Sequence, residues 1–174
     1  MRFAMAIDTK KCVGCSDCMV ACQLENNVPV EYTRSWITES IKGSYPKTQL
    51  TFQSERCNHC ENAPCVRCCP TDASFVNESG VVLVNAKKCI GCGACVESCP
   101  YEARYMHPET GVADKCTFCD HRETPACVGV CPTQCMYFGD VDDPNSEISK
   151  LLSKRKTRTL LPQAGTQPSI YYLI

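Results

Sequence analysis

The sequence predicts an α+β fold that consists of two nested units with short strands, short helices and long loops. Three observations support this fold class. Eighteen of the 174 residues are cysteine, and they fall into four groups. Short runs of β-prone residues flank these groups. Without its cysteines, only about a third of the chain is apolar, so bound metal has to help organise the interior.

The four cysteine groups have related spacing. Groups one and three, CVGCSDCMVAC and CIGCGACVESC, separate successive cysteines by two, two and three residues. Group two, CNHCENAPCVRCC, and group four, CTFCDHRETPACVGVC, lengthen the second gap. This is an internal repeat, in which one arrangement of ligands is used four times.

The spacing favours iron–sulfur clusters as the bound group. Three cysteines within seven residues can wrap a turn around one 4Fe-4S cube, and a fourth before a proline then reaches a neighbouring cluster. Thiolates are the soft donors that such clusters require. Zinc sites and a disulfide framework are the alternatives. Zinc ribbons pair two C-x2-C doublets, however, and useful disulfides join cysteines that are further apart in sequence. We therefore expect four 4Fe-4S clusters.

The flanking strands indicate which groups share clusters. β-prone runs at 73–76 and 81–84 flank the turn NESG, which predicts a hairpin between groups two and three. We expect LTF before group two and ARYM after group three to pair as closing strands. FAMAID and MYFGD would close a second unit around groups one and four, with further strands at 36–40 and 111–115. Pairing of group one with two, and of three with four, is the alternative.

The nested pairing predicts two ferredoxin-like units, each with two clusters. The outer unit comprises residues 1–49 and 105–145, and the inserted unit comprises residues 50–104. Residues 146–174 are expected to form a C-terminal helix and an extended tail that contacts a partner.

Each cluster would take three cysteines from one group and a fourth from the partner group. The four expected ligand sets, numbered here as the first to fourth sites, are Cys12, Cys15, Cys18 with Cys131; Cys57, Cys60, Cys65 with Cys99; Cys89, Cys92, Cys95 with Cys69; and Cys116, Cys119, Cys127 with Cys22. Cys69 is preferred to Cys68 because it directly precedes a proline, as Cys99 and Cys131 do. Cys68 and Cys135 are left over, and Cys68 is expected to be a small buried apolar residue.

Charge and hydropathy exclude some classes of function. The formal net charge is −1, so the chain has no basic footprint for nucleic acid. Four occupied cluster sites would make the protein more acidic, because each adds a net charge of about −2. No apolar run is long enough to span a bilayer, and no targeting segment is visible at the N-terminus. We expect any membrane association to come through a partner.

Over nearly its whole length the chain resembles a known family, the four-cluster, ferredoxin-type electron-transfer subunits of molybdopterin oxidoreductases. Polysulfide, thiosulfate and dimethyl sulfoxide reductases contain such subunits, and the short link between groups three and four is most similar to the first two. The segments that carry the resemblance are MAIDTKKCVGCSDCMVACQLENNVP, CNHCENAPCV, KKCIGCGACVESCPYEARY, KCTFCDH, PACVGVCPTQC, FGDVDDPNS and GTQPSIYYL.

The resemblance implies a relay of single electrons between a quinone-reactive membrane subunit and a molybdopterin-containing catalytic subunit, without a catalytic site in this chain. It also implies that groups one and four, and groups two and three, share clusters. A peripheral complex on the periplasmic face, exported with a signal-bearing partner, is the expected location, and the cytoplasm is the alternative. A soluble polyferredoxin and a cluster-containing enzyme are the competing hypotheses.

Several other residues carry weaker expectations. His59 and His121 adjoin ligand cysteines, where a ring N–H could bond sulfur or a carbonyl, but a packing or solvated histidine is the simpler interpretation. His107 is expected at the surface and Trp36 in the core. Residues 150–158, KLLSKRKTR, predict a solvated helix end, with a docking patch for an acidic partner as the alternative. The tail QPSIYYLI shows no periodicity, and we expect it to lie along a partner.

Overall fold

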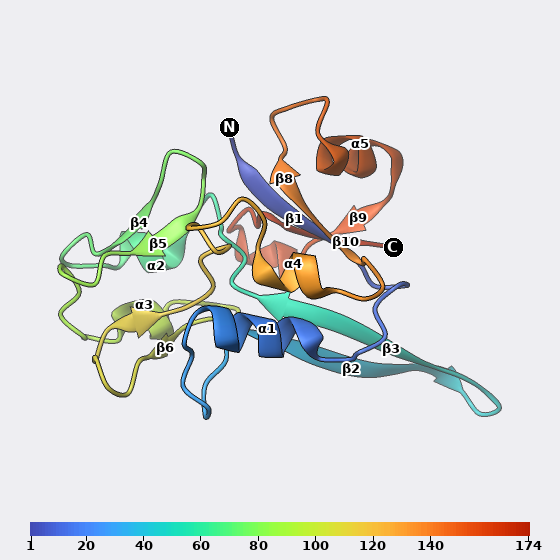
Figure 1. Cartoon of the computed structure of the whole chain (residues 1–174), viewed down its shortest axis with the longest axis horizontal. Helices are drawn as coiled ribbons and strands as arrows, with labels where there is room; N and C mark the ends of the chain where they lie inside the picture. The colour runs from blue at the N-terminus through green and yellow to red at the C-terminus, as the bar shows by residue number, and fades with distance from the viewer.

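The computed structural model describes residues 1–174 and has the predicted α+β character, with short elements joined by long loops. Its largest sheet joins the two ends of the chain (Figure 1). The four strands lie in the order β8 (Met136–Asp140), β1 (Phe3–Asp8), β10 (Ile170–Leu173) and β9 (Thr157–Arg158). β1 pairs antiparallel with β8, which confirms the expected pairing of FAMAID with MYFGD, and parallel with β10.

The predicted C-terminal helix is α5 (Glu147–Lys154), which packs on this sheet. Ser146 caps its first turn, because its Oγ accepts the Ser149 N–H at 3.1 Å. Ile148 is buried in a small apolar cluster with Ala4, Ala6 and Leu173. Helix and sheet therefore share a core that contains no cysteine.

Three hairpins complete the strands. β2 (Ser35–Ser44) pairs with β3 (Lys47–Arg56), β4 (Ser74–Val76) with β5 (Val82–Val84), and β6 (Tyr105–Met106) with β7 (Ala113–Asp114). The hairpin between groups two and three is confirmed, as are strands at 36–40 and within 111–115. The expected pairing of LTF with ARYM is wrong. Each segment pairs with its nearest neighbour in sequence instead, which costs less loop-closure entropy.

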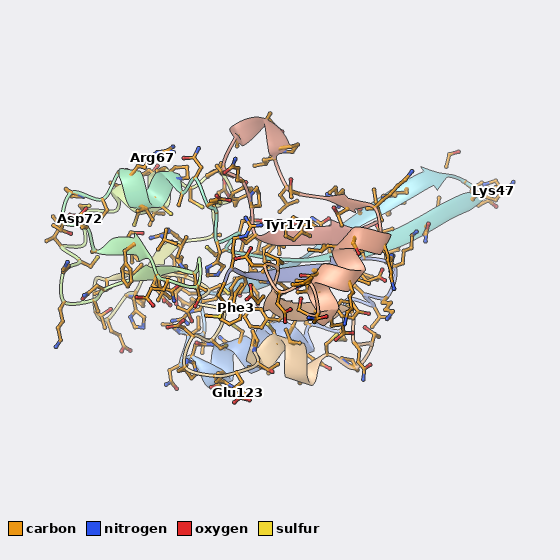
Figure 2. All side chains as sticks on the ribbon, turned by 90° about the horizontal axis from the view of Figure 1, so that it is seen from above. Phe3, Lys47, Arg67, Asp72, Glu123 and Tyr171 are labelled. Atoms are coloured by element: carbon orange, nitrogen blue, oxygen red, sulfur yellow. The ribbon has the colours of Figure 1, made fainter.

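The short helices associate in two pairs. α1 (Asp17–Glu25) packs against α4 (Ala126–Val130), and α2 (Pro64–Arg67) packs against α3 (Ala94–Glu97). α1 and α4 carry ligand cysteines of groups one and four, whereas α2 and α3 carry those of groups two and three. In Figure 1 the second pair lies beside the β4–β5 hairpin, away from the main sheet. The β2–β3 hairpin projects from the body, with Lys47 at its tip (Figure 2).

The C-terminal tail departs from the sequence expectation. A 3-10 turn at Pro162–Ala164 leads into β10, in which Ile170, Tyr172 and Leu173 are fully buried. Before β10, the backbone of residues 166–169 exchanges hydrogen bonds with residues 58–62 of group two. This part of the tail is therefore covered by the chain itself, because β10 fills a place beside β1 in the main sheet, and contact of the tail with a partner stays a prediction.

The central core is built largely from sulfur. Eight of its twenty buried residues are cysteines: Cys18, Cys57, Cys60, Cys65, Cys95, Cys116, Cys127 and Cys135. The fold thus directs thiols toward the interior, where apolar side chains would otherwise lie. No helix is long and apolar enough to cross a membrane.

Candidate iron–sulfur sites

Each cysteine group begins with the same backbone turn. The residue just before the second cysteine has a positive φ in all four groups: 71° at Gly14, 42° at His59, 71° at Gly91 and 54° at Phe118. Glycine adopts this conformation without strain, whereas other residues reach it only at a cost. At Gly14 an added Cβ would also overlap the ring of Phe52. In groups two and four the rings of His59 and Phe118 stack at a centroid distance of 3.7 Å, which joins the two turns.

The segment after the fourth cysteine also repeats. Cys69, Cys99 and Cys131 each precede a proline, and the residue three positions after each has a positive φ: Asp72 (52°), Glu102 (52°) and Gln134 (48°). The backbone then turns back on the sulfur. The Ser74 N–H lies 3.4 Å from Cys69 Sγ, and the Cys135 N–H lies 3.5 Å from Cys131 Sγ. Such N–H···S contacts orient a thiolate and raise the potential of a bound cluster.

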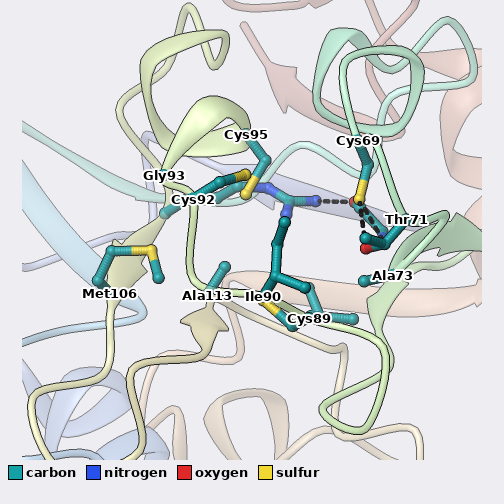
Figure 3. Close-up of a pocket in the computed structure, with 13 residues that line it drawn as sticks. Cys69, Thr71, Ala73, Cys89, Ile90, Cys92, Gly93, Cys95, Met106 and Ala113 are labelled. Carbon is teal, nitrogen blue, oxygen red and sulfur yellow. Dashed lines mark hydrogen bonds between the residues drawn. The ribbon is translucent and has the colours of Figure 1, made fainter.

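The structure gathers cysteines from different groups around common cavities. Cys69 reaches its cavity from a different segment than Cys89, Cys92 and Cys95 (Figure 3). Two more cavities lie between groups one and four and correspond to the expected fourth and first sites. The cysteines that line them are Cys22, Cys116, Cys119 and Cys127 in the fourth-site cavity, and Cys12, Cys15, Cys18, Cys131 and Cys135 in the first-site cavity.

The remaining four expected ligands also lie close together. Burial raises the pKa of Cys60 to about 12, and the neighbouring thiols of Cys57, Cys65 and Cys99 add to this effect. The pKa of Cys65 is raised by burial and by Cys57 and Cys99. Cys99, which comes from group three, therefore lies among the cysteines of group two.

Asn26 links the fourth cysteine of group one to group four. Its side-chain N–H group lies 3.7 Å from Cys22 Sγ and 3.9 Å from Cys119 Sγ. Arg34 orients this amide by donating to Asn26 Oδ1 at 2.7 Å, and is itself held by Asp114. The amide is thus fixed with its donor toward two sulfurs.

The two surplus cysteines differ in their surroundings. Cys68 is half-buried, and its Sγ lies 3.2 Å from Ser98 Oγ outside the cavities described above. Cys135 is fully buried, lines the cavity of the first site and lies 3.5 Å from Cys131 Sγ. The corresponding positions of the other two loops hold Ala73 and Ala103.

Three buried cations lie among these thiols. Arg56, Lys115 and Arg104 are 1%, 1% and 5% exposed. Arg56 Nη1 donates to Cys127 Sγ at 2.9 Å, Lys115 Nζ donates to the Cys116 carbonyl at 2.7 Å, and Arg104 lines the third-site cavity. The structure contains no carboxylate partner for any of the three. Buried cations are costly unless anions compensate them, and here only thiolates are available.

The cations and the thiols complement one another, and together they fit the binding of an anionic cluster. Burial raises the pKa of Cys22 to about 11 and that of Cys116 to about 12, which disfavours the thiolates that iron requires. Nearby positive charge acts in the opposite direction, and Arg56 lowers the pKa of both thiols. Four sets of four thiols with cations between them therefore fit four 4Fe-4S clusters, which carry about −2 each.

The sequence reasoning missed these three cations and Asn26. A usable signal was present, because a basic residue precedes the first cysteine of every group: Lys11, Arg56, Lys88 and Lys115. The spacing alone could not show which of these basic residues are buried. Those of groups two and four, Arg56 and Lys115, are buried, whereas Lys11 and Lys88 of groups one and three are exposed.

The other singled-out residues have structural roles. His59 is a buried packing residue whose Nδ1 accepts the Val82 N–H at 3.2 Å, and burial, reinforced by the surrounding cations, lowers its pKa well below the ordinary value. His121 is exposed and contacts Glu25, and His107 is half-buried just before a turn at 108–110. Trp36 is half-buried against the core.

The basic segment 150–158 is partly bound within the chain. Arg155 pairs with the buried Asp8 at 2.6 Å, and Arg158 lies over the Tyr172 ring. These two side chains attach the end of α5 and the edge strand β9 to the inner strands of the main sheet.

Comparison with known proteins assigns these sites to a family. A family described as "4Fe-4S dicluster domain" matches residues 48–141, and a second family of the same description matches residues 11–73. A polysulfide reductase subunit of Wolinella succinogenes is 43% identical over 177 aligned residues, which cover 98% of the present sequence and 93% of that protein. This protein belongs to the four-cluster, ferredoxin-type iron–sulfur subunits.

Two further relatives of this iron–sulfur subunit have similar coverage. The thiosulfate reductase electron transfer subunit PhsB of Salmonella typhi is 44% identical, over 89% of this sequence and 83% of that protein. Protein NrfC of Escherichia coli K12 is 44% identical, over 98% of this sequence and 80% of that protein. The subunit is thus an iron–sulfur electron-transfer protein with four 4Fe-4S clusters, as the sequence predicted.

Proposed function

We propose that this subunit relays single electrons between a quinone-reactive membrane subunit and a molybdopterin-containing catalytic subunit of a reductase for sulfur compounds. The observation that carries the proposal is the gathering of sixteen expected ligands into four neighbouring sites within one short chain. The names of the relatives support sulfur compounds as the class of terminal substrate.

We also propose the four ligand sets predicted from the spacing. Three cavities, each lined by four of the expected cysteines, and the cluster of thiols around Cys60 support them. The packing of α1 on α4, and of α2 on α3, supports sharing between groups one and four and between two and three. The same contacts support an outer unit of residues 1–49 and 105–145 with residues 50–104 inserted.

The arrangement of buried and exposed ligands fits a relay. A bound 4Fe-4S cluster takes up and releases one electron without a change of substrate. The second and fourth sites are lined mainly by buried cysteines, whereas Cys15 of the first site and Cys92 of the third are exposed. The protein therefore shields the second and fourth sites from water and brings the first and third sites near its surface, where partners can dock.

Affinity purification of the tagged subunit from native membranes tests this function. We expect a membrane subunit and a molybdopterin protein to copurify, with about sixteen irons per chain in anaerobic preparations. Protease treatment of intact spheroplasts should cleave the subunit if the complex lies on the periplasmic face after export with a signal-bearing partner. Recovery of the loaded subunit alone from the soluble fraction would favour a free polyferredoxin instead.

A further inference from the structure

Each of the three buried cations lies at a junction between two of the four sites. Arg56 Nη1 contacts Cys127 of the fourth site at 2.9 Å, and its Nη2 contacts Ser54, whose Oγ lies 3.6 Å from Cys18 of the first site. Arg56 therefore connects the first and fourth sites through one direct contact and one hydroxyl.

Lys115 and Arg104 occupy the next two junctions. Lys115 Nζ donates to the Cys116 carbonyl of the fourth site at 2.7 Å and to the Val82 carbonyl. The Val82 N–H donates at 3.2 Å to His59, which lies between Cys57 and Cys60 of the second site. Arg104 lines the third-site cavity, where it donates to Ser74 Oγ at 2.8 Å. Strand β4, which carries Ser74, packs against α2, which carries Cys65 of the second site. The thiols of Cys65 and Cys57 favour the charged form of Arg104 against the opposing effect of burial.

The two buried arginines have donors that no protein group accepts. Arg56 Nε and Arg104 Nε and Nη1 are buried without a hydrogen-bond partner. The only buried carboxylate, Asp8, is already paired with Arg155. An unpaired guanidinium is expensive in the interior, so its compensation has to come from the ligand sets on either side.

We propose that Arg56, Lys115 and Arg104 form a series of shared counter-charges, one at each junction in the order first, fourth, second and third site. Each cation stabilises the more negative, reduced state of the two clusters beside it, and so holds both reduction potentials up. Because each is shared, loss of one affects a specific pair of clusters. This inference rests on the ligand sets proposed above.

The test is an EPR-monitored redox titration of the anaerobic holoprotein with Arg56→Met, Arg56→Lys and the control Lys154→Met, which removes an exposed cation of α5. In Arg56→Met we expect two of the four clusters to become at least tenfold harder to reduce, which is a shift of about 59 mV for one electron. Arg56→Lys should recover at least part of the shift, and Lys154→Met should leave all four potentials unchanged.

Arg104→Met and Arg104→Lys repeat the test between the second and third sites, and the pair of clusters that they affect should share no member with the pair that Arg56 affects. No shift in either Met variant, or an equal shift of all four clusters, would overturn the proposal. If a Met variant loses iron, the proposal requires that the Lys variant retain it, and equal loss in both would also overturn it. Iron content below about sixteen in the unmutated protein would instead contradict the ligand sets, so the two failures are distinguishable.

Discussion

Strand β10 gives the most direct prediction, because the sequence suggests a tail that lies along a partner, whereas the structure places this strand in the core. Tyr172 is fully buried, and its hydroxyl donates to the Ser54 carbonyl at 3.2 Å. The next residue toward the N-terminus, Tyr171, is only half-buried. Two adjacent tyrosines of one strand therefore differ in burial, and each serves as the control for the other.

We expect Tyr172→Ala to lower the free energy of unfolding by about 3–5 kcal/mol, as for other large aromatic residues deleted from a core. Tyr172→Phe removes one hydrogen bond and should cost about 1 kcal/mol. For a protein of this size, 1 kcal/mol corresponds to about 2–4 °C in Tm, so Tyr172→Ala should melt about 6–20 °C lower.

The assay is anaerobic thermal unfolding of the loaded protein at one scan rate, followed by far-UV circular dichroism and by the visible absorbance of the clusters. Tyr171→Ala should shift Tm by less than half as much as Tyr172→Ala. Equal, small shifts for both alanine variants would refute the placement of β10 in the core and would restore a tail that is free to bind a partner.

The remaining predictions concern ligands, backbone and charge. Cys69→Ala should lose about four of sixteen irons and one EPR signal, whereas Cys68→Ala should keep all four clusters. A normal iron content in the first variant would contradict the ligand assignment. Gly14→Ala should destabilise the first site by at least about 1–2 kcal/mol, since its φ is 71° and the new Cβ would meet Phe52; faster loss of cluster absorbance on exposure to air measures this. Asp8→Asn should cost about 1.5–3 kcal/mol at neutral pH, read as a lower Tm. Burial tends to raise the pKa of Asp8, but its arginine partner and a backbone N–H lower it below the ordinary value. The ionised form therefore contributes stability at neutral pH that is lost as the pH falls through the folded pKa, and a pH-independent effect of the mutation would contradict this.

Much of the site could be predicted from the sequence because cluster ligation depends on local spacing. Three thiols within seven residues define one turn, and the prolines after Cys69, Cys99 and Cys131 mark where each fourth sulfur lies. The strands β1 and β8 were predictable for a similar reason, since they flank the outermost groups. The sequence also distinguished Cys69 from Cys68 as the candidate ligand, and their surroundings differ accordingly.

Only the tertiary structure decided which strands pair locally, where the tail lies and which charges are buried. LTF and ARYM have the composition of strands, but composition carries no information about the partner, and the nearer segments win because short loops cost less entropy. Arg56 and Lys88 both precede a cysteine, yet only Arg56 is enclosed. The reason is physical: the spacing of cysteines fixes the position of thiols along the sequence, whereas the burial of a cation depends on every element that folds over it.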